Sequence, residues 1–196
     1  MATISATRNR DVTVERSSIY QSLFMDRRAA LLWLPIRVWL GLQWLEAGSH
    51  KITDAAWMDG GLALKGFWTN AVAIPENGRP LIAFDWYRSF LQTLLDMEAY
   101  TWFGKLIAVG ETMIGIALIV GALVGVAAFF GAFMNWNFMM AGSASTNPLL
   151  FVVAIGLLLA WRVSGYIGLD YILFNAQRIR DWLAARRQSA PSGSGA

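Results

Sequence analysis

Residues 102–141 read WFGKLIAVGETMIGIALIVGALVGVAAFFGAFMNWNFMMA, and this stretch decides the fold. A helix that crosses a bilayer needs about 20 mostly apolar residues. Segments 102–121 and 124–141 are both of about this length, and only a few residues around Gly121 and Gly125 join them. Two apolar helices joined so closely must run antiparallel. The stretch therefore predicts a transmembrane helical hairpin.

Two further apolar stretches, at about residues 29–51 and 148–167, extend this hairpin into a bundle. Asn147 is a suitable N-cap for the second stretch, and Pro148 suits the first helical position. The chain of 196 residues is 56% hydrophobic and 15% charged, whereas soluble domains carry about 25% charged residues. The sequence therefore predicts an all-α membrane protein built as a bundle of four transmembrane helices.

The two ends of the chain indicate its orientation. Residues 1–28 form a polar segment with several arginines, and we expect residues 175–196 to combine a basic amphipathic helix with a disordered tail. Basic flanks favour the cytoplasm. An even number of spans then puts both termini on the cytoplasmic side of the plasma membrane. The net charge of +3 is concentrated at these ends, which suits a membrane surface better than nucleic acid.

The segment between the first two spans, residues 52–101, lies outside in this arrangement. It contains two amphipathic stretches separated by the turn-rich IPENGRP, residues 74–80. We expect these stretches to form extracytoplasmic amphipathic helices of a single membrane domain, residues 29–174. Two interpretations stay open, since such helices can shield the bundle at the interface or form a cap over a site.

Composition excludes several kinds of site. The chain has no cysteine, which excludes disulfides, thiolate metal sites and cysteine nucleophiles. It has one histidine, His50, so a histidine-rich metal site is not expected. The sequence therefore predicts no metal centre.

Polar residues on three predicted spans reach a similar depth in the outer half of the membrane. A helical rise of about 1.5 Å per residue puts Glu46 about 10 Å, Glu111 about 13 Å and Asn135 about 9 Å below the outer ends of their helices. Ionisable residues inside a span are costly and usually face the bundle interior or a wet cavity. We therefore predict one buried polar site in the outer half of the bundle.

Three residues are candidates for proton chemistry at this site. Glu111 is a candidate for proton handling or substrate binding. Glu46 and His50 are four residues apart, and histidine changes its charge near neutral pH, so this pair can pass a proton to the outside or form a simple local pair. The structural alternative for Glu111 is a hydrogen bond across helices from Arg37 or Lys51.

Three stretches of the chain resemble the DoxX and DoxD family of membrane proteins. They are RVWLGLQWLEAGSHKI (37–52), GETMIGIALIVGAL (110–123) and GSASTNPLLFVVAIGLLLAWRVSGYIGLDYIL (142–173). The resemblance covers roughly residues 29–174. It is carried by an ordered set of residues: Arg37, Gly48, Lys51, Gly110, Glu111, Asn147, Pro148, Gly165, Leu169 and Asp170.

This resemblance implies a four-helix membrane bundle and a redox function. DoxD-type members resemble the large subunit of thiosulfate:quinone oxidoreductase, which oxidises thiosulfate to tetrathionate and passes electrons to a membrane quinone together with the small subunit DoxA. The resemblance thus implies a quinone as cofactor, a small sulfur oxyanion as substrate, and other protein subunits as partners beside the lipid bilayer.

Site residues follow from the polar cluster and the resemblance together. The expected catalytic residues are Glu111, Glu46 and His50. The residues expected to bind substrate or quinone are Arg37, Gln43, Trp44, Lys51, Lys105, Asn135 and Trp136. Trp44 or Trp136 would stack on a quinone ring. The alternative function is non-catalytic: an accessory subunit that anchors a respiratory or other membrane redox complex.

Overall fold

The computed structural model describes residues 18–176 and residue 180. Every element of secondary structure in this part of the chain is helical, which confirms the all-α class. Most of the predicted C-terminal amphipathic helix and tail, and residues 1–17 of the polar N-terminal segment, lie outside the described residues.

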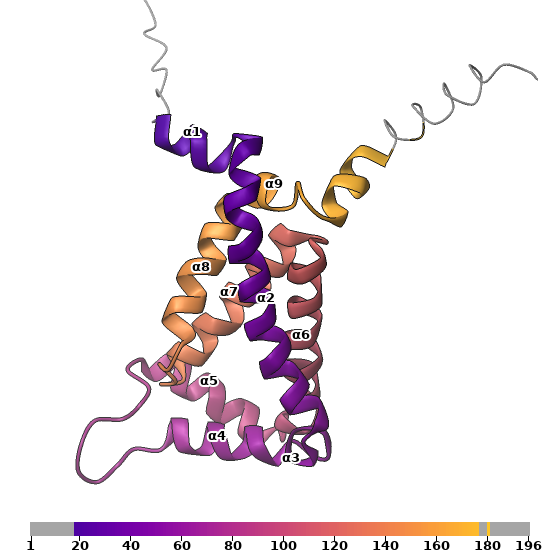
Figure 1. Ribbon diagram of the computed structural model, residues 1–196. Helices are drawn as coiled ribbons and strands as arrows, with labels where there is room; N and C mark the ends of the chain where they lie inside the picture. Colours follow the sequence, from indigo (N-terminus) through magenta and orange to yellow (C-terminus); the bar gives the residue numbers. More distant parts are fainter. Residues whose placement is uncertain (1–17, 177–179, 181–196) are drawn as a thin grey trace, which may run out of the picture.

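Four long helices form the body of the molecule: α2 (Ala30–Thr53), α6 (Tyr100–Val120), α7 (Val124–Met140) and α8 (Asn147–Leu159). They run between two ends (Figure 1). At the first, here termed the α9 end, lie α1 (Ser18–Phe24), the short 3₁₀ helix η1 (Arg27–Ala29), α9 (Trp161–Ser164) and a helical segment at 169–176. At the opposite end, the α4 end, lie α3 (Ala55–Met58), α4 (Leu62–Val72) and α5 (Asp85–Asp96).

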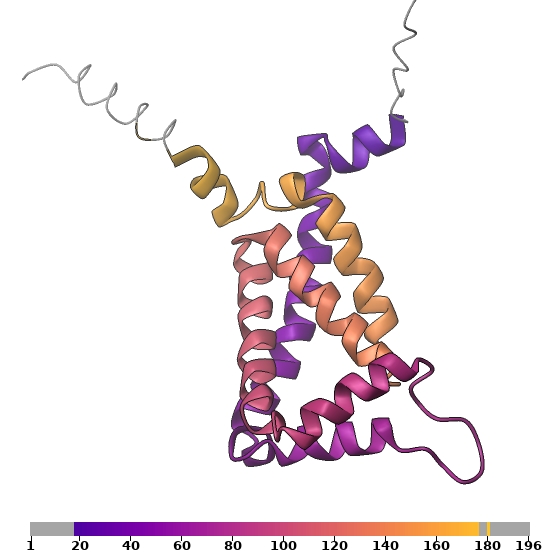
Figure 2. The same cartoon turned by 180° about the vertical axis from the view of Figure 1, so that it is seen from behind.

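The pair α2–α6 and the pair α7–α8 lie closer together at the α9 end than at the α4 end (Figure 2). A turn around Gly121 joins α6 directly to α7, and Gly121 has a φ of 70°, a left-handed conformation that favours glycine. One hydrophobic core fills the space between the long helices, and a second lies among α4, α5 and the adjoining ends of α6 and α7. Met134 and Phe138 of α7 pack against both cores.

Among the described helices, α6 is long and apolar enough to cross a membrane, judged by length and composition alone. The helices α7 and α8 are also apolar, but they have 17 and 13 residues and are shorter than a usual span. The helix α2 has 24 residues and carries the charged side chains of Arg37, Glu46 and Lys51. By length and composition, the structure thus supports one membrane span among the described helices, α6.

The fourth apolar stretch differs from its prediction. Instead of one helix over 148–167, α8 ends at Leu159, and α9 follows after Ala160. The chain bends here, and the carbonyl oxygens of Ser164 and Ile167 accept hydrogen bonds from Arg37 in place of a helical partner. The start of α8 is also shifted, because Thr146 and not Asn147 occupies the N-cap position.

Close packing of α2 on α6 depends on glycine. A Cβ added to Gly115 of α6 would lie 2.5 Å from the backbone nitrogen of Leu45, and one added to Gly48 of α2 would overlap Thr112. Small residues at such contacts allow two helices to approach each other closely. The approach brings the last turns of α2 beside the middle of α6, where Glu111 lies.

Candidate functional site

A polar cavity of about 530 Å³ lies among α2, α6, α7 and the start of α8, towards the α4 end. Its walls include seven of the residues predicted for the site: Gln43, Trp44, Glu46, His50, Lys51, Glu111 and Asn135. Three helices therefore bring these side chains together around one space, which we call the polar cavity.

An ion pair crosses the polar cavity from α2 to α6. Lys51 Nζ lies 2.6 Å from Glu111 Oε2, the distance of a short charge-assisted hydrogen bond. The Glu111 side chain is 1% exposed and that of Lys51 is 20% exposed, so the carboxylate is enclosed while the lysine side chain is partly exposed. Lys51 Nζ also lies 5.1 Å from the centre of the Trp57 ring, within the range of a cation–π contact. Glu111 thus has the interhelical partner that the structural alternative predicts.

Two buried side chains in the wall lack hydrogen-bond partners. Asn135 on α7 is fully buried, and neither its Oδ1 nor its Nδ2 has a partner among the described residues. The indole Nε1 of Trp44, a residue 3% exposed, is likewise unpaired in this part of the chain. An unsatisfied buried polar group costs about 1–3 kcal/mol. The three unpaired atoms belong to residues that line one cavity, which makes this cavity the candidate site for a polar ligand or bound water.

Gly131 allows Trp44 to occupy this position. A Cβ added to Gly131 would lie 3.2 Å from Trp44 Nε1 and 3.4 Å from its neighbouring ring carbon. The bare backbone of α7 therefore leaves room for the indole, one helical turn before Asn135. This spacing puts the two unpaired groups on the same side of α7.

The opening of the polar cavity is hydrophilic. Glu46 and His50 are exposed there, and they form no ion pair with each other in the structure. Another part of the wall consists of Ser143, Ser145 and Thr146, from the loop before α8, and Asn147, the first residue of α8. Asn147 Nδ2 donates to the Ser143 carbonyl oxygen at 2.9 Å and so holds this loop to the helix start. The sequence predicts only a helix cap here and gives no signal that these residues line the cavity.

Three predicted site residues lie outside the polar cavity: Arg37, Lys105 and Trp136. Lys105 is exposed on α6, and Trp136 is 36% exposed on α7, where its ring packs edge-on against Tyr87. Helical geometry explains why Trp136 does not line the cavity. One residue turns a helix by about 100°, so the residue after Asn135 cannot share its face. Depth alone does not bring a side chain into a site.

Arg37 belongs to a different polar group, at the α9 end. Its Nη1 and Nη2 donate to the carbonyl oxygens of Ser164 and Ile167 at 2.7 and 3.0 Å. The buried carboxylate of Asp170 accepts from the backbone nitrogens of Leu123 and Val124 at 2.5 and 2.9 Å. We call this group the Arg37–Asp170 cluster.

Glycines make the Arg37–Asp170 cluster possible. A Cβ on Gly121 would overlap the Arg37 guanidinium, and one on Gly165 would lie 2.5 Å from the Asp170 carboxylate. The cluster ties α2, the α6–α7 turn and the chain after α9 to one another. Arg37, Gly165 and Asp170, three of the residues that carry the family resemblance, therefore have a structural role here.

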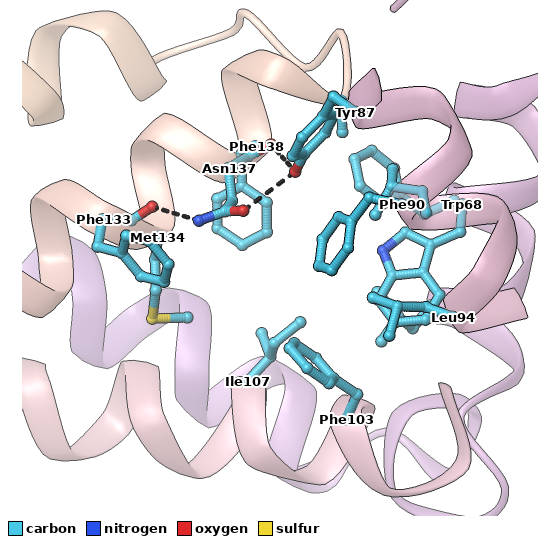
Figure 3. A pocket seen from close by; sticks show the side chains of 14 residues that line it. Trp68, Tyr87, Phe90, Leu94, Phe103, Ile107, Phe133, Met134, Asn137 and Phe138 are labelled. Atoms are coloured by element: carbon cyan, nitrogen blue, oxygen red, sulfur yellow. Dashed lines mark hydrogen bonds between the residues drawn. The ribbon is translucent and has the colours of Figure 1, made fainter. Parts of the chain in front are cut away.

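A second cavity, of about 150 Å³, lies between α4, α5, α6 and α7 (Figure 3). Aromatic and aliphatic side chains form most of its wall, and we call it the aromatic chamber. Its hydroxyl and amide groups bond to each other: Tyr87 Oη donates to Asn137 Oδ1 at 3.1 Å, and Asn137 Nδ2 donates to the Phe133 carbonyl oxygen at 2.8 Å. Burial raises the pKa of Tyr87 to about 12, so its phenol stays a neutral donor at physiological pH. The sequence does not predict this chamber, because apolar faces of interfacial helices can equally face lipid.

Comparisons of the chain with models of protein families, with curated proteins and with solved structures give no match. The similarity to the DoxX and DoxD family therefore rests on the sequence stretches that carry it, and remains a prediction.

Proposed function

We propose that this protein is an integral membrane subunit of a quinone-linked redox system, similar to thiosulfate:quinone oxidoreductase, and that the polar cavity binds the quinone. The observation that carries the proposal is the set of unpaired buried groups on Asn135 and Trp44 beside the Lys51–Glu111 ion pair. A fully satisfied interior would need no ligand at this position.

In this proposal α2, α6, α7 and α8 all cross the plasma membrane. The apolar span of α6 supports it, as do the large apolar side chains exposed on the outward faces of the long helices. Examples on α6 and α7 are Met113, Ile116, Val126, Phe129 and Phe130. The described parts that lead to both termini lie at the α9 end, which would face the cytoplasm, so the polar cavity would lie in the outer half of the membrane (Figure 1).

The donors in the cavity fit a quinone. Quinone carbonyl oxygens accept hydrogen bonds, and both Trp44 Nε1 and Asn135 Nδ2 are donors without partners in the described chain. Lys51 adds a positive charge at the same wall, which also suits a sulfur oxyanion at the opening. When bound, a quinone supplies two-electron, two-proton redox chemistry.

The chain itself would bind, orient and handle protons. Trp44 and Asn135 would fix the orientation of the carbonyl group, because both are buried in packed helices. Lys51 Nζ donates a hydrogen bond to Glu111 Oε2 in the wall of the cavity, where this pair would hold a proton. Glu46 and His50 are exposed at the opening and would exchange protons with the outer water.

A non-catalytic accessory subunit is the second candidate. One observation favours it: Glu111, the deepest acidic candidate, already has Lys51 as its partner. In that case the ion pair would hold α2 to α6, and the exposed apolar faces would contact other subunits of a redox complex.

Binding of a soluble quinone analogue tests the proposal. The protein is purified in detergent, and the affinity of a tail-less dimethoxy-methyl benzoquinone is measured by titration calorimetry for the wild type, Asn135→Leu and Trp44→Phe. We expect each variant to weaken binding by about tenfold, the effect of one lost hydrogen bond to a buried partner. Trp136→Phe is the matched control, since Trp136 lies outside the polar cavity, and it should bind like the wild type.

Absence of quinone binding to the wild type would overturn the proposal, as would equal binding by all variants. The catalytic and accessory candidates separate in a second measurement, thiosulfate-dependent reduction of the same analogue. Activity that is lost in Glu111→Gln favours catalysis. Quinone binding without activity, together with stoichiometric copurifying chains, favours the accessory subunit.

A further inference from the structure

The geometry points to a divided binding site: we propose that the aromatic chamber holds the apolar chain of the same ligand whose polar ring the polar cavity binds. This inference rests on the proposed function and adds the part of the ligand that lies beyond the ring. The ligand class is then a quinone with a prenyl-type tail, rather than a small water-soluble quinone.

The two cavities share a wall. Phe67 of α4 and Phe138 of α7 line both the polar cavity and the aromatic chamber. Neither ring is fully buried, and Phe138 packs against both hydrophobic cores. A ligand seated beside Asn135 would therefore have these two rings between itself and the chamber, and in this proposal its apolar chain passes along them.

The two cavities differ in the state of their polar groups. Asn135, in the polar cavity, is unpaired, whereas Asn137, two residues later on α7, is bonded to Tyr87 and to the backbone. Tyr87 and Asn137 thus need no hydrogen bond from a ligand, and the remaining wall is mainly aromatic and aliphatic (Figure 3). Such a chamber suits an apolar occupant.

The size of the chamber limits that occupant. A dry apolar cavity of about 150 Å³ is large enough for a molecule such as benzene. The aromatic chamber, also about 150 Å³, therefore suits about one prenyl unit of a longer chain. The outer helices α4 and α5 form one side of it, so they would hold the tail as well as cover the bundle.

A substitution that fills the chamber tests the inference. Leu94 of α5 points into the chamber (Figure 3), and Leu94→Trp should occupy its space. Affinities are measured for a tail-less dimethoxy-methyl benzoquinone and for the same ring with one prenyl group. We expect the preference of the wild type for the prenylated ring to fall about tenfold in Leu94→Trp, while the affinity for the tail-less ring stays unchanged.

Leu106→Trp provides the matched control, since Leu106 is 55% exposed on α6 and lines neither cavity. It should keep the preference of the wild type, and both variants share the same detergent, so partition of the tail into micelles cancels. Circular dichroism checks that each variant folds. Leu94→Phe and Leu94→Ala extend the series if the tryptophan does not fit: the first should reduce the preference, and the second should shift it towards a longer chain.

The outcomes are distinct for the two proposals. Failure of the tail-less ring to bind the wild type overturns the proposed function. If the tail-less ring binds but the preference for the prenylated ring is absent, or is equal in the Leu94 and Leu106 variants, the aromatic chamber does not hold the tail and only the divided site is overturned.

Discussion

Polar side chains are buried at both ends of the long helices, and the two groups differ in how they are satisfied. In the Arg37–Asp170 cluster, each carboxylate oxygen of Asp170 and both terminal nitrogens of Arg37 bond to backbone groups, and one buried atom, Arg37 Nε, has no partner among the described residues. In the polar cavity, Lys51 and Glu111 bond to each other, while Asn135 and the Trp44 indole have no partner among the described residues.

This difference separates structure from binding. A buried polar group that is hydrogen-bonded to the backbone stabilises the fold at the place where it lies. An unpaired one destabilises the fold and is retained at functional sites, where a ligand or water completes its bonds. The largely bonded cluster at the α9 end therefore fits a role in stability, and the three unpaired atoms at the polar cavity support the proposal that this cavity binds a ligand. We expect opposite effects on stability from removing a bonded group and from removing an unpaired one.

The largest effect on stability is expected at the Lys51–Glu111 ion pair, a part of the polar cavity whose polar groups are bonded to each other. Lys51→Met leaves the enclosed Glu111 carboxylate without its partner and should lower the free energy of unfolding by about 3–5 kcal/mol. Glu111→Gln should cost less, because the partly exposed Lys51 can turn to water at the opening. Unfolding by SDS in mixed micelles, followed by circular dichroism, gives both values. Equal losses in the two variants would show that the carboxylate is not the enclosed partner.

Asp170→Ala should produce the next largest effect, at the other end of the comparison. It leaves the backbone nitrogens of Leu123 and Val124 without acceptors at a buried turn, which should cost about 3 kcal/mol. Quinone binding should not change, because the cluster lies outside the polar cavity. Asp170→Asn keeps one acceptor and should retain part of the stability. A variant with normal stability and lost quinone binding would reverse the assignment of the two ends.

Regular helix geometry made much of this arrangement predictable from the sequence. Length and hydropathy predict the α6–α7 hairpin, and a constant rise per residue predicts that Glu111 and Asn135 lie at similar depth. The structure does bring these two side chains to one cavity, although their proposed roles are still untested. Glycines at helix contacts are equally visible in the sequence as small residues at helical spacing.

The partners of Arg37 could not be predicted, because backbone carbonyls carry no residue-type signature. They become available only where the chain bends after α8, a tertiary feature that hydropathy does not record. Trp136 lies outside the polar cavity for another reason: it has nearly the depth of Asn135, but one residue turns the helix by about 100° and points its side chain elsewhere. The aromatic chamber depends on how α4 and α5 fold back, and their amphipathic pattern is compatible with many positions.

A smaller effect on stability is expected at the contact of Gly48 in α2 with Thr112 in α6. Gly48→Ala introduces a methyl group against Thr112 of α6, one turn from Lys51, and should cost about 1–3 kcal/mol while weakening quinone binding. Gly110→Ala is the matched control, since a Cβ there meets no atom within 4 Å. It should be neutral or stabilise α6 by up to about 1 kcal/mol. Equal destabilisation by both variants would indicate a requirement for glycine that close packing does not explain.

The smallest change in stability is expected at Asn135, and it best distinguishes an unpaired buried amide from a bonded one. Asn135→Leu removes two unpaired polar atoms from the interior and should leave the free energy of unfolding unchanged or raise it by about 1 kcal/mol, although it removes one of the two proposed hydrogen bonds to the ligand. Asn137→Leu, two residues later, removes a bonded amide and one of the two acceptors of the buried Tyr87 hydroxyl; the Asn137 backbone carbonyl remains as the other, so the substitution should lower that free energy by up to about 1 kcal/mol. Unfolding in mixed micelles without ligand compares the two variants directly.

The changes in the free energy of unfolding should have opposite signs in the two variants. A clear loss of stability in Asn135→Leu would mean that Asn135 is satisfied inside the fold, and the polar cavity would then be structural, like the Arg37–Asp170 cluster.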